Sequence, residues 1–294
     1  MFAIIGILIV IGGVFGGYIE SGGKIEVIFE ALPHELMTIG GAAVGAFLIA
    51  NSKPVLKHAG AAVKTVFKGE HYKKDDYKEL LLLMFSLTKL MKTKGLVAVE
   101  QHIEKPDDSE IFRAYPRVAH STFAVHLICD YMRMLTMDLS DANTLDDAME
   151  KEIEKCLQEE LHGSHAIQTM ADGIPALGIV AAVLGVIKTM GSINEPPEIL
   201  GRMIGGALVG TFLGVFLAYG FVGPFASRSG QAVSEDIQFY RIIKEILVAH
   251  LKGCPPQISI EIGRGNIPSH LQPTFQEMEQ AMENMPSGNA PAAA

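Results

Sequence analysis

Residues Met170–Met190 read MADGIPALGIVAAVLGVIKTM, an apolar run in the middle of the chain. About 20 such residues are enough to cross the hydrocarbon core of a bilayer as a helix, so the run predicts a membrane span. Its small residues recur at alternating three- and four-residue steps, which places them on one helical face: Pro175, Gly178, Ala182, Gly185 and Thr189. Lipid-facing surfaces carry bulk, so this face indicates close approach to another helix or the wall of a narrow cavity.

A second apolar run, Gly201–Ser227, repeats the pattern and has Pro224 near its end. The connection between the runs, Ser192–Glu198, is short and contains two prolines, which stop a helix. We therefore expect two antiparallel neighbouring spans. Pro175 and Pro224 fall at similar depth by this count, and they predict matched points where the bundle flexes. The small face of the second run comprises Ala207, Thr211, Gly214 and Ala218.

Two further apolar runs lie near the N-terminus, at Met1–Ile19 and His34–Ser52. No basic residue precedes the first, so we interpret it as a retained span rather than a secretory signal peptide. The composition agrees, because 49% of the 294 residues are hydrophobic and only 19% are charged. The sequence thus predicts an all-α membrane protein whose four transmembrane helices form two hairpins.

Lysines set the expected orientation. The first connection contains only Lys24, whereas four lysines follow the second span: Lys53, Lys57, Lys64 and Lys68. The positive-inside rule then places both termini and the long middle segment in the cytoplasm. The expected parts are spans one and two at 1–52, a helical cytoplasmic domain at 53–168, spans three and four at 169–227, and a cytoplasmic helix with a disordered tail at 228–294.

Within the polar parts we expect several helices. Lys78–Ile103 and Val118–Leu139 have amphipathic patterns, and a charged helix over Thr144–Met170 runs into span three. Ser234 has the features of an N-cap that starts a helix ending at Gly253.

Several functions are excluded because the sequence lacks the motifs and charge patterns that they require. The net charge of −9 leaves no overall basic footprint for nucleic acid, and no nucleotide-binding or hydrolase motif stands in a supporting context. His162 and His165 are three residues apart without further ligands at metal-site spacing, so we expect no metal and no cofactor. The predicted span interiors contain no Asp, Glu or His, and Glu35, Asp172, Lys188 and Arg202 lie at their edges. An ion-conducting bundle would then need a titratable group from another chain, and a passive scaffold is the alternative.

Two threonines lie on the small faces. The hydroxyls of Thr189 and Thr211 can line a hydrated path, or they can bond back to the carbonyl one turn earlier. The mid-span position of Thr211 favours the path for that residue alone. In the middle segment, Lys92 and Glu100 belong to a charged stretch that spacing alone assigns to a solvated helix face.

Four blocks of sequence, in order along the chain, resemble the MotA family of flagellar stator membrane subunits. They are VEQHIEKPDDSEIFRAYPRV, ADGIPALGIVAAVLGVIKTMGS, ALVGTFLGVFLAYGFVGP and IEIGR. The resemblance implies a pentamer around a MotB-like single-span partner that carries the ion-binding Asp. It also implies proton flow coupled to torque on a FliG-like rotor protein in the bacterial inner membrane, with Na⁺ the less favoured coupling ion.

The resemblance also assigns roles to residues. It implies that Pro175 and Pro224 are the functional prolines and that Thr211 lines the channel. Ala182 and Thr189, on the same small face as Pro175, complete the candidate ion-path residues. Glu100 matches the acidic rotor-binding residue, and Lys92 stands where family members often have Arg. An energising subunit of the ExbB or TolQ kind, which typically has three spans, is the related alternative.

Overall fold

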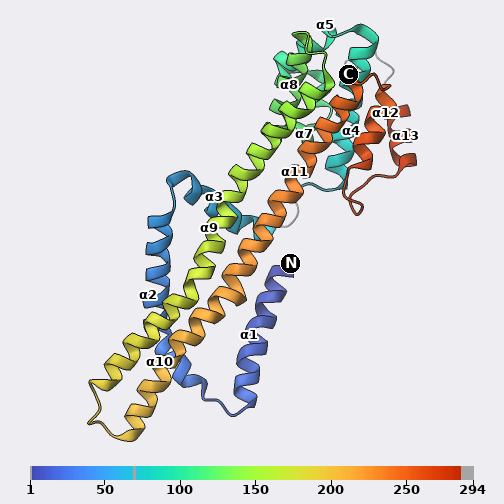
Figure 1. Ribbon diagram of the computed structural model, residues 1–294. Helices are drawn as coiled ribbons and strands as arrows, with labels where there is room; N and C mark the ends of the chain where they lie inside the picture. Colours follow the sequence, from blue (N-terminus) through green and yellow to red (C-terminus); the bar gives the residue numbers. More distant parts are fainter. Residues whose placement is uncertain (1, 69–70, 286–294) are drawn as a thin grey trace. The chain divides into compact units, whose positions relative to one another are not determined.

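The structure is a computed structural model that describes residues 2–68 and 71–285 (Figure 1). The described residues form helices and no strand. The sequence predicts disorder over Met285–Ala294, and residues 286–294 of that tail lie outside the described ranges. The chain divides into two compact units, one made of residues 1–69 and 158–233 and the other of residues 70–157 and 234–294. Helices α9 and α11 contribute residues to both units.

Four helical stretches of the described chain are long and apolar enough to cross a membrane. All of them contribute to the first unit, and each lies wholly or partly where the sequence places a span. The helices are α1 (Phe2–Glu20), α2 (Ile25–Ala50), α9 (Ala142–Met190) and α10 (Pro197–Leu217), the last continuing through a π turn into α11 (Gly223–Leu251).

Helix α2 begins at Ile25, well before the expected start at His34. Pro33, which the sequence pattern suggests as a boundary, lies inside the helix. Proline is tolerated inside membrane helices because neighbouring groups and small local adjustments satisfy the freed carbonyl. At 26 residues, α2 is about 39 Å long, which exceeds the hydrocarbon core of about 30 Å.

The small faces of α9 and α10 pack directly against each other (Figure 1). A Cβ added to Gly178 would lie 2.8 Å from the Gly210 carbonyl oxygen and 3.0 Å from Gly214 Cα. One added to Gly185 would lie 2.6 Å from Ala207 Cβ. Gly178 thus faces Gly214 and Gly185 faces Ala207, so residue numbers rise along α9 as they fall along α10. The two helices are antiparallel neighbours, as the sequence predicts.

This register separates the two prolines. It sets residue 217 opposite Pro175, so Pro224 lies about two turns away along the helix pair. The expectation that they lie at similar depth is therefore wrong. The two backbones also respond differently, since α9 continues through Pro175 whereas a π turn at Ala218–Val222 precedes Pro224. A proline lacks an N–H group and its ring clashes with the carbonyl four residues back, which accounts for the wider turn.

Helix α3 (Lys53–Lys68) packs with the membrane-spanning unit, although the sequence assigns its residues to the cytoplasmic domain. Ala59 and Ala62 form a buried cluster with Ile167 of α9 and Ala226 of α11. The α3 backbone also lies against Gly163 of α9, where an added Cβ would be 2.6 Å from the carbonyl carbon of His58.

The second unit is a bundle of short helices around α4 (Lys74–Lys94), whose leucines at 80, 81, 83 and 87 are fully buried. The helix expected over Lys78–Ile103 is two helices, because Gly95 has a φ of 81° and ends α4. The pattern over Val118–Leu139 is likewise divided. The remaining helices are α5 (Val97–Glu104), η1 (Pro106–Asp108), α6 (Glu110–Arg113), α7 (Pro116–Ala119), α8 (Thr122–Thr136), α12 (Pro256–Gly265) and α13 (Phe275–Glu283).

Helix α11 runs unbroken through Ser234, so the predicted N-cap is wrong. Buried side chains continue across this point, with Ala232 before it and Ile237 after it, and tertiary packing overrides the local start signal. Further along α11, the Lys244 ammonium group lies 2.8 Å from both a carboxylate oxygen of Asp146 and one of Glu150. These ion pairs join α11 to the first part of α9 inside the second unit.

The glycine-to-glycine packing leads to a first prediction. In Gly178→Ala, the new methyl group meets the Gly210 backbone, so we expect the unfolding free energy to fall by about 1–3 kcal/mol, the usual cost of overpacking. Gly173→Ala is the matched control, because a Cβ there has no neighbour within 4 Å. Thermal unfolding of the purified membrane complex, followed by circular dichroism, measures both. Equal midpoints for the two variants would contradict the packing described here.

Candidate functional site

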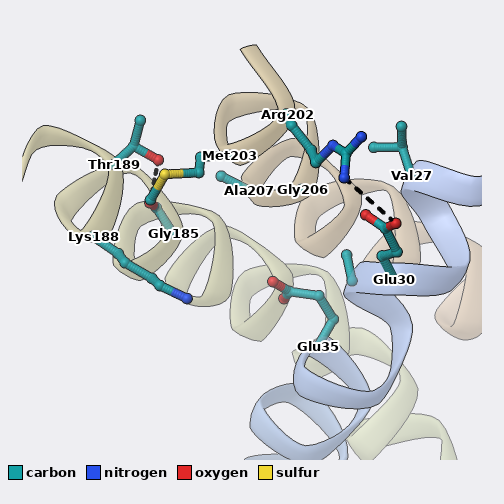
Figure 2. Close-up of a pocket in the computed structure, with 11 residues that line it drawn as sticks. Val27, Glu30, Glu35, Gly185, Lys188, Thr189, Arg202, Met203, Gly206 and Ala207 are labelled. Atoms are coloured by element: carbon teal, nitrogen blue, oxygen red, sulfur yellow. Dashed lines mark hydrogen bonds and ion pairs between the residues drawn. The ribbon is translucent and has the colours of Figure 1, made fainter. Parts of the chain in front are cut away.

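The main candidate site is a polar cavity among α2, α9 and α10, shown in Figure 2. Its volume is about 200 Å³. Helix α2 supplies two carboxylates, α9 supplies a lysine and a threonine, and α10 supplies an arginine together with small residues that leave the space open. The polar lining residues are Glu30, Glu35, Lys188, Thr189 and Arg202.

Glu35 is the most unusual of these side chains. Its Oε2 atom is buried and has no hydrogen-bond partner among the described residues. The same atom lies against Gly210 of α10, at 2.6 Å from where a Cβ would stand. An ionised carboxylate removed from water is costly unless it is paired, and within a membrane span such a residue is by default a functional candidate. The arrangement can hold a proton, or it can accept a hydrogen bond from water or from another chain.

The position of Glu35 overturns the expectation that it lies at the edge of its span. The early start of α2 puts it ten residues inside the helix, so one carboxylate does lie within a predicted span. A helical signal is present in the sequence. Apolar residues follow three- and four-residue spacing through Pro33, and that spacing continues the helix back to Ile25: Ile25, Ile28, Phe29, Leu32, Leu36 and Ile39.

The other charges of the cavity are more exposed. The Arg202 guanidinium group lies 3.8 Å from the Glu30 carboxylate, and both side chains are mostly exposed (Figure 2). Lys188 is also exposed and its ammonium group points toward the same space (Figure 2). The cavity therefore has an accessible charged rim, with Glu35 at its buried end.

The two candidate threonines differ in what they bond. The Thr189 hydroxyl donates a 2.9 Å hydrogen bond to the Gly185 carbonyl oxygen one turn earlier, and its side chain is buried beside the cavity. Thr211 is half-buried, and within residues 2–68 and 71–285 its hydroxyl makes no hydrogen bond. The hydroxyl of Thr211 is therefore available to water or to a partner chain.

The remaining predicted ion-path residues are distributed over the α9–α10 pair. Ala182 belongs to the packed interface, since its backbone nitrogen lies 3.1 Å from a Cβ built on Gly210. Pro175 is half-buried within α9. Pro224 is exposed and lines a separate apolar cavity of about 410 Å³ beside α1. The structure thus joins Ala182 and Thr189 to the packed interface and places Pro224 elsewhere.

A broad apolar face of α9 has no packing partner within the described chain. Its residues are 45–65% exposed and would lie against lipid or against another protein chain: Ile179, Val180, Val183, Leu184, Val186 and Ile187. The opposite face of α9 carries the small residues. One helix therefore presents both a closed intrachain interface and an open surface.

The predicted rotor-binding residues lie in the second unit. Lys92 is in the last turn of α4 and Glu100 is in α5, and both side chains are exposed. The sharp turn at Gly95 separates them. Near Lys92 lies His250, whose Nδ1 atom is buried and lacks a hydrogen bond in the described chain. Burial lowers the pKa of His250 and the nearby Lys92 ammonium group lowers it further, so this imidazole is neutral at pH 7.

Comparison with protein families matches two models to the chain. Residues 4–95 match the N-terminal model of motility protein A, and residues 118–241 match the MotA/TolQ/ExbB proton channel family. The first match covers α1 to α4 and the second covers α9, α10 and the first part of α11. Together they include every membrane-spanning helix described above.

Whole-length relatives agree with these matches. The chain is 36% identical to motility protein A of Salmonella typhimurium, over 95% of this chain and 94% of that protein. It is 34% identical to the chemotaxis protein LafT of Vibrio parahaemolyticus, over 94% of this chain and 96% of that protein.

Two solved structures share the fold. The C. jejuni MotAB structure has a TM-score of 0.71 at 19% identity and covers 91% of this chain and 95% of its own. The flagellar MotAB stator complex of Bacillus subtilis has a TM-score of 0.68 at 22% identity, with coverages of 88% and 92%. The chain is a multi-pass membrane protein, and it belongs to the motility protein A family, the stator subunits among the MotA/TolQ/ExbB proton channel proteins.

Proposed function

We propose that this stator subunit works with a MotB-like single-span partner to conduct protons across the bacterial inner membrane and to turn that flow into torque. The observation that carries the proposal is the buried, unpartnered Oε2 atom of the half-buried Glu35 side chain beside the α9–α10 interface. A group of this kind needs a proton or an incoming donor to offset its burial. No cofactor enters the proposal, and the partner supplies the principal ion-binding Asp.

The proposed path uses the chain's own small and polar residues. Protons enter through the charged rim formed by Glu30, Lys188 and Arg202, and Glu35 receives them at the buried end. The Thr211 hydroxyl, which makes no hydrogen bond in the described chain, orders water toward the partner's Asp. The exposed apolar face of α9 gives the partner's helix a surface to pack against. Pro175 and the π turn before Pro224 are the points where the helices flex when the Asp is neutralised.

Energetics fit a stepping motor. Moving one charge across the membrane releases about 2.3 kcal/mol per 100 mV. An exposed ion pair is worth only about 0.2–1 kcal/mol. A contact between the exposed Lys92 or Glu100 and a FliG-like rotor protein is therefore weak enough to break at each step. The exposed apolar face of α9 supports association with further copies and with the partner's helix, as in a pentameric ring.

The proposed orientation places both termini and the second unit in the cytoplasm. It rests on the lysines that follow α2, in contrast to the single Lys24 in the first connection. Alternatives differ in support. Similarity to motility proteins along 95% of the chain favours a stator over an energising subunit of the ExbB or TolQ kind. A non-conducting scaffold predicts that site substitutions alter assembly alone, and sodium coupling predicts speed that follows external Na⁺.

The contrast between the two threonines supplies a test of the path. In Thr211→Val, loss of one water-binding hydroxyl is expected to lower proton flow about two- to tenfold, which corresponds to one hydrogen bond. In Thr189→Val, the lost bond is internal to α9, so flow is retained. Cytoplasmic pH after opening of the assembled channel measures both variants, with membrane levels of the complex as the control. Equal flow in the two variants would remove Thr211 from the path.

Glu35 supplies a second test. Glu35→Gln keeps the shape of the side chain but cannot release a proton, so we expect swimming speed to fall severalfold with assembly intact. Glu26→Gln is the matched control, because Glu26 is an exposed carboxylate in the first turn of the same helix and does not line the cavity. Speed measured across a range of external pH separates the two variants. Unchanged speed for Glu35→Gln at every pH would show that its carboxylate takes no part in conduction.

The rotor contact is tested by charge. Lys92→Glu and Glu100→Lys are each expected to reduce swimming strongly, because attraction at the rotor becomes repulsion, while proton flow through the complex persists. Lys151→Glu, which changes an exposed lysine elsewhere in the second unit, is the control and is expected to swim normally. If both reversals left torque and motor switching intact, the rotor surface would have to lie elsewhere.

A further inference from the structure

Helix α3 has three distinct faces, which follow from its sequence at 100° per residue. Ala59, Ala62 and Val66 are buried against the spans. Val63 and Phe67 form a second face that is apolar yet 39% and 47% exposed. The third face is a narrow lysine stripe within about 40° of arc: Lys53, Lys57 and Lys64.

The lysine stripe has no counter-charge in the described part of the protein. All three lysines are exposed, and within the described ranges none of them lies in ion-pair distance of a carboxylate. The nearest carboxylate to another polar side chain of the helix is that of Glu160 of α9, which lies 3.7 Å from His58 Nδ1 on a different face. The stripe is therefore an unsatisfied positive surface next to an exposed apolar one.

The position of α3 is tied to the end of a membrane span. Helix α2 ends at Ala50, and only Asn51 and Ser52 separate it from Lys53. Two extended residues reach about 7 Å, so α3 begins close to the level at which α2 leaves the hydrocarbon core. A helix at that level with an exposed Phe and a lysine row has the composition of an interfacial helix.

We infer that α3 lies in the membrane surface and binds the headgroups of anionic phospholipids through Lys53, Lys57 and Lys64. Val63 and Phe67 enter the boundary between headgroups and acyl chains, and the lysine stems extend beside them to the phosphates. In the proposed orientation this is the cytoplasmic leaflet. The inference does not depend on the proton path, and it assigns a lipid class to a surface that the proposed function leaves unused.

The contacts of α3 indicate what the bound lipid would do. Its backbone presses on α9 at Gly163, and Phe67 packs edge-to-face on Phe225 of α11 with ring centroids 5.6 Å apart. An α3 held by the leaflet therefore braces α9 and α11 where they lie beside it.

The absence of Trp from the sequence provides a direct experiment. Phe67→Trp places one indole on α3 of the full complex, with any Trp of the partner chain replaced by Phe. The complex is reconstituted in vesicles of brominated phosphatidylglycerol or brominated phosphatidylcholine, both of which quench nearby Trp fluorescence. Met137→Trp, at an exposed site of the second unit, is the control that neither lipid should quench.

We expect both lipids to quench the fluorescence of the Phe67→Trp complex, and phosphatidylglycerol to do so severalfold more strongly at low salt. Each lysine near an anionic leaflet strengthens binding about fivefold. The preference is therefore expected to vanish when Lys53, Lys57 and Lys64 are all changed to Gln, and to survive when all three are changed to Arg. It is also expected to survive when exposed Lys105, Lys151 and Lys155 are changed to Gln instead.

Two outcomes would overturn the inference. Absence of quenching by either lipid would place α3 away from the membrane and leave the stripe to an acidic protein. Equal quenching by both lipids, unchanged by salt and by the triple Gln variant, would show that α3 contacts the membrane only through its apolar residues and that the lysines bind no anionic headgroup. Salt titration of the parent complex gives the same information if the triple Gln variant fails to assemble, because screening weakens headgroup binding without any substitution.

Discussion

Backbone-to-backbone packing of α9 against α10 is the constraint on which the rest of the structure depends. Gly178, Gly210 and Gly214 bring the two helices so close that almost no side-chain volume separates them. In a membrane, where lipid is as apolar as protein, such packing supplies much of the attraction between helices. Because the small faces are used up in this contact, the bulky face of α9 is left outward for lipid and other chains. Helix α2 packs against both α9 and α10.

Much of this arrangement is predictable from sequence. The small-residue spacing in Met170–Met190 and Gly201–Ser227 predicts the antiparallel pair, and the length and composition of the apolar runs predict four spans. Two of the errors have a common physical cause, which is that tertiary packing overrides a local signal. Pro33 and Ser234 each have the chemistry of a helix boundary, yet each lies inside a continuous helix.

The site is predictable only in part, for the same reason. A misplaced start of α2 assigns Glu35 to an edge, so its burial against Gly210 cannot be foreseen. The mid-span position of Thr211 favours a role in the path for that residue alone, but only coordinates reveal the hydrogen bond to Gly185 that occupies the Thr189 hydroxyl. Lys92 and Glu100 are exposed, as their spacing implies. Their geometry resembles that of other exposed charged residues, and only the family resemblance assigns them a rotor-binding role. Their proposed function depends on a partner protein, which is a separate chain.

Gly210 takes part in two contacts at once. It lets α9 approach α10, and the same missing side chain leaves room for the Glu35 carboxylate. A methyl group at this position would therefore disturb the helix pair and displace the acid together. Over evolutionary time the two positions cannot drift independently. A larger residue at 210 requires both a shorter or differently placed side chain at 35 and a shift of α9, so the effect of a change at 210 depends on the residue at 35.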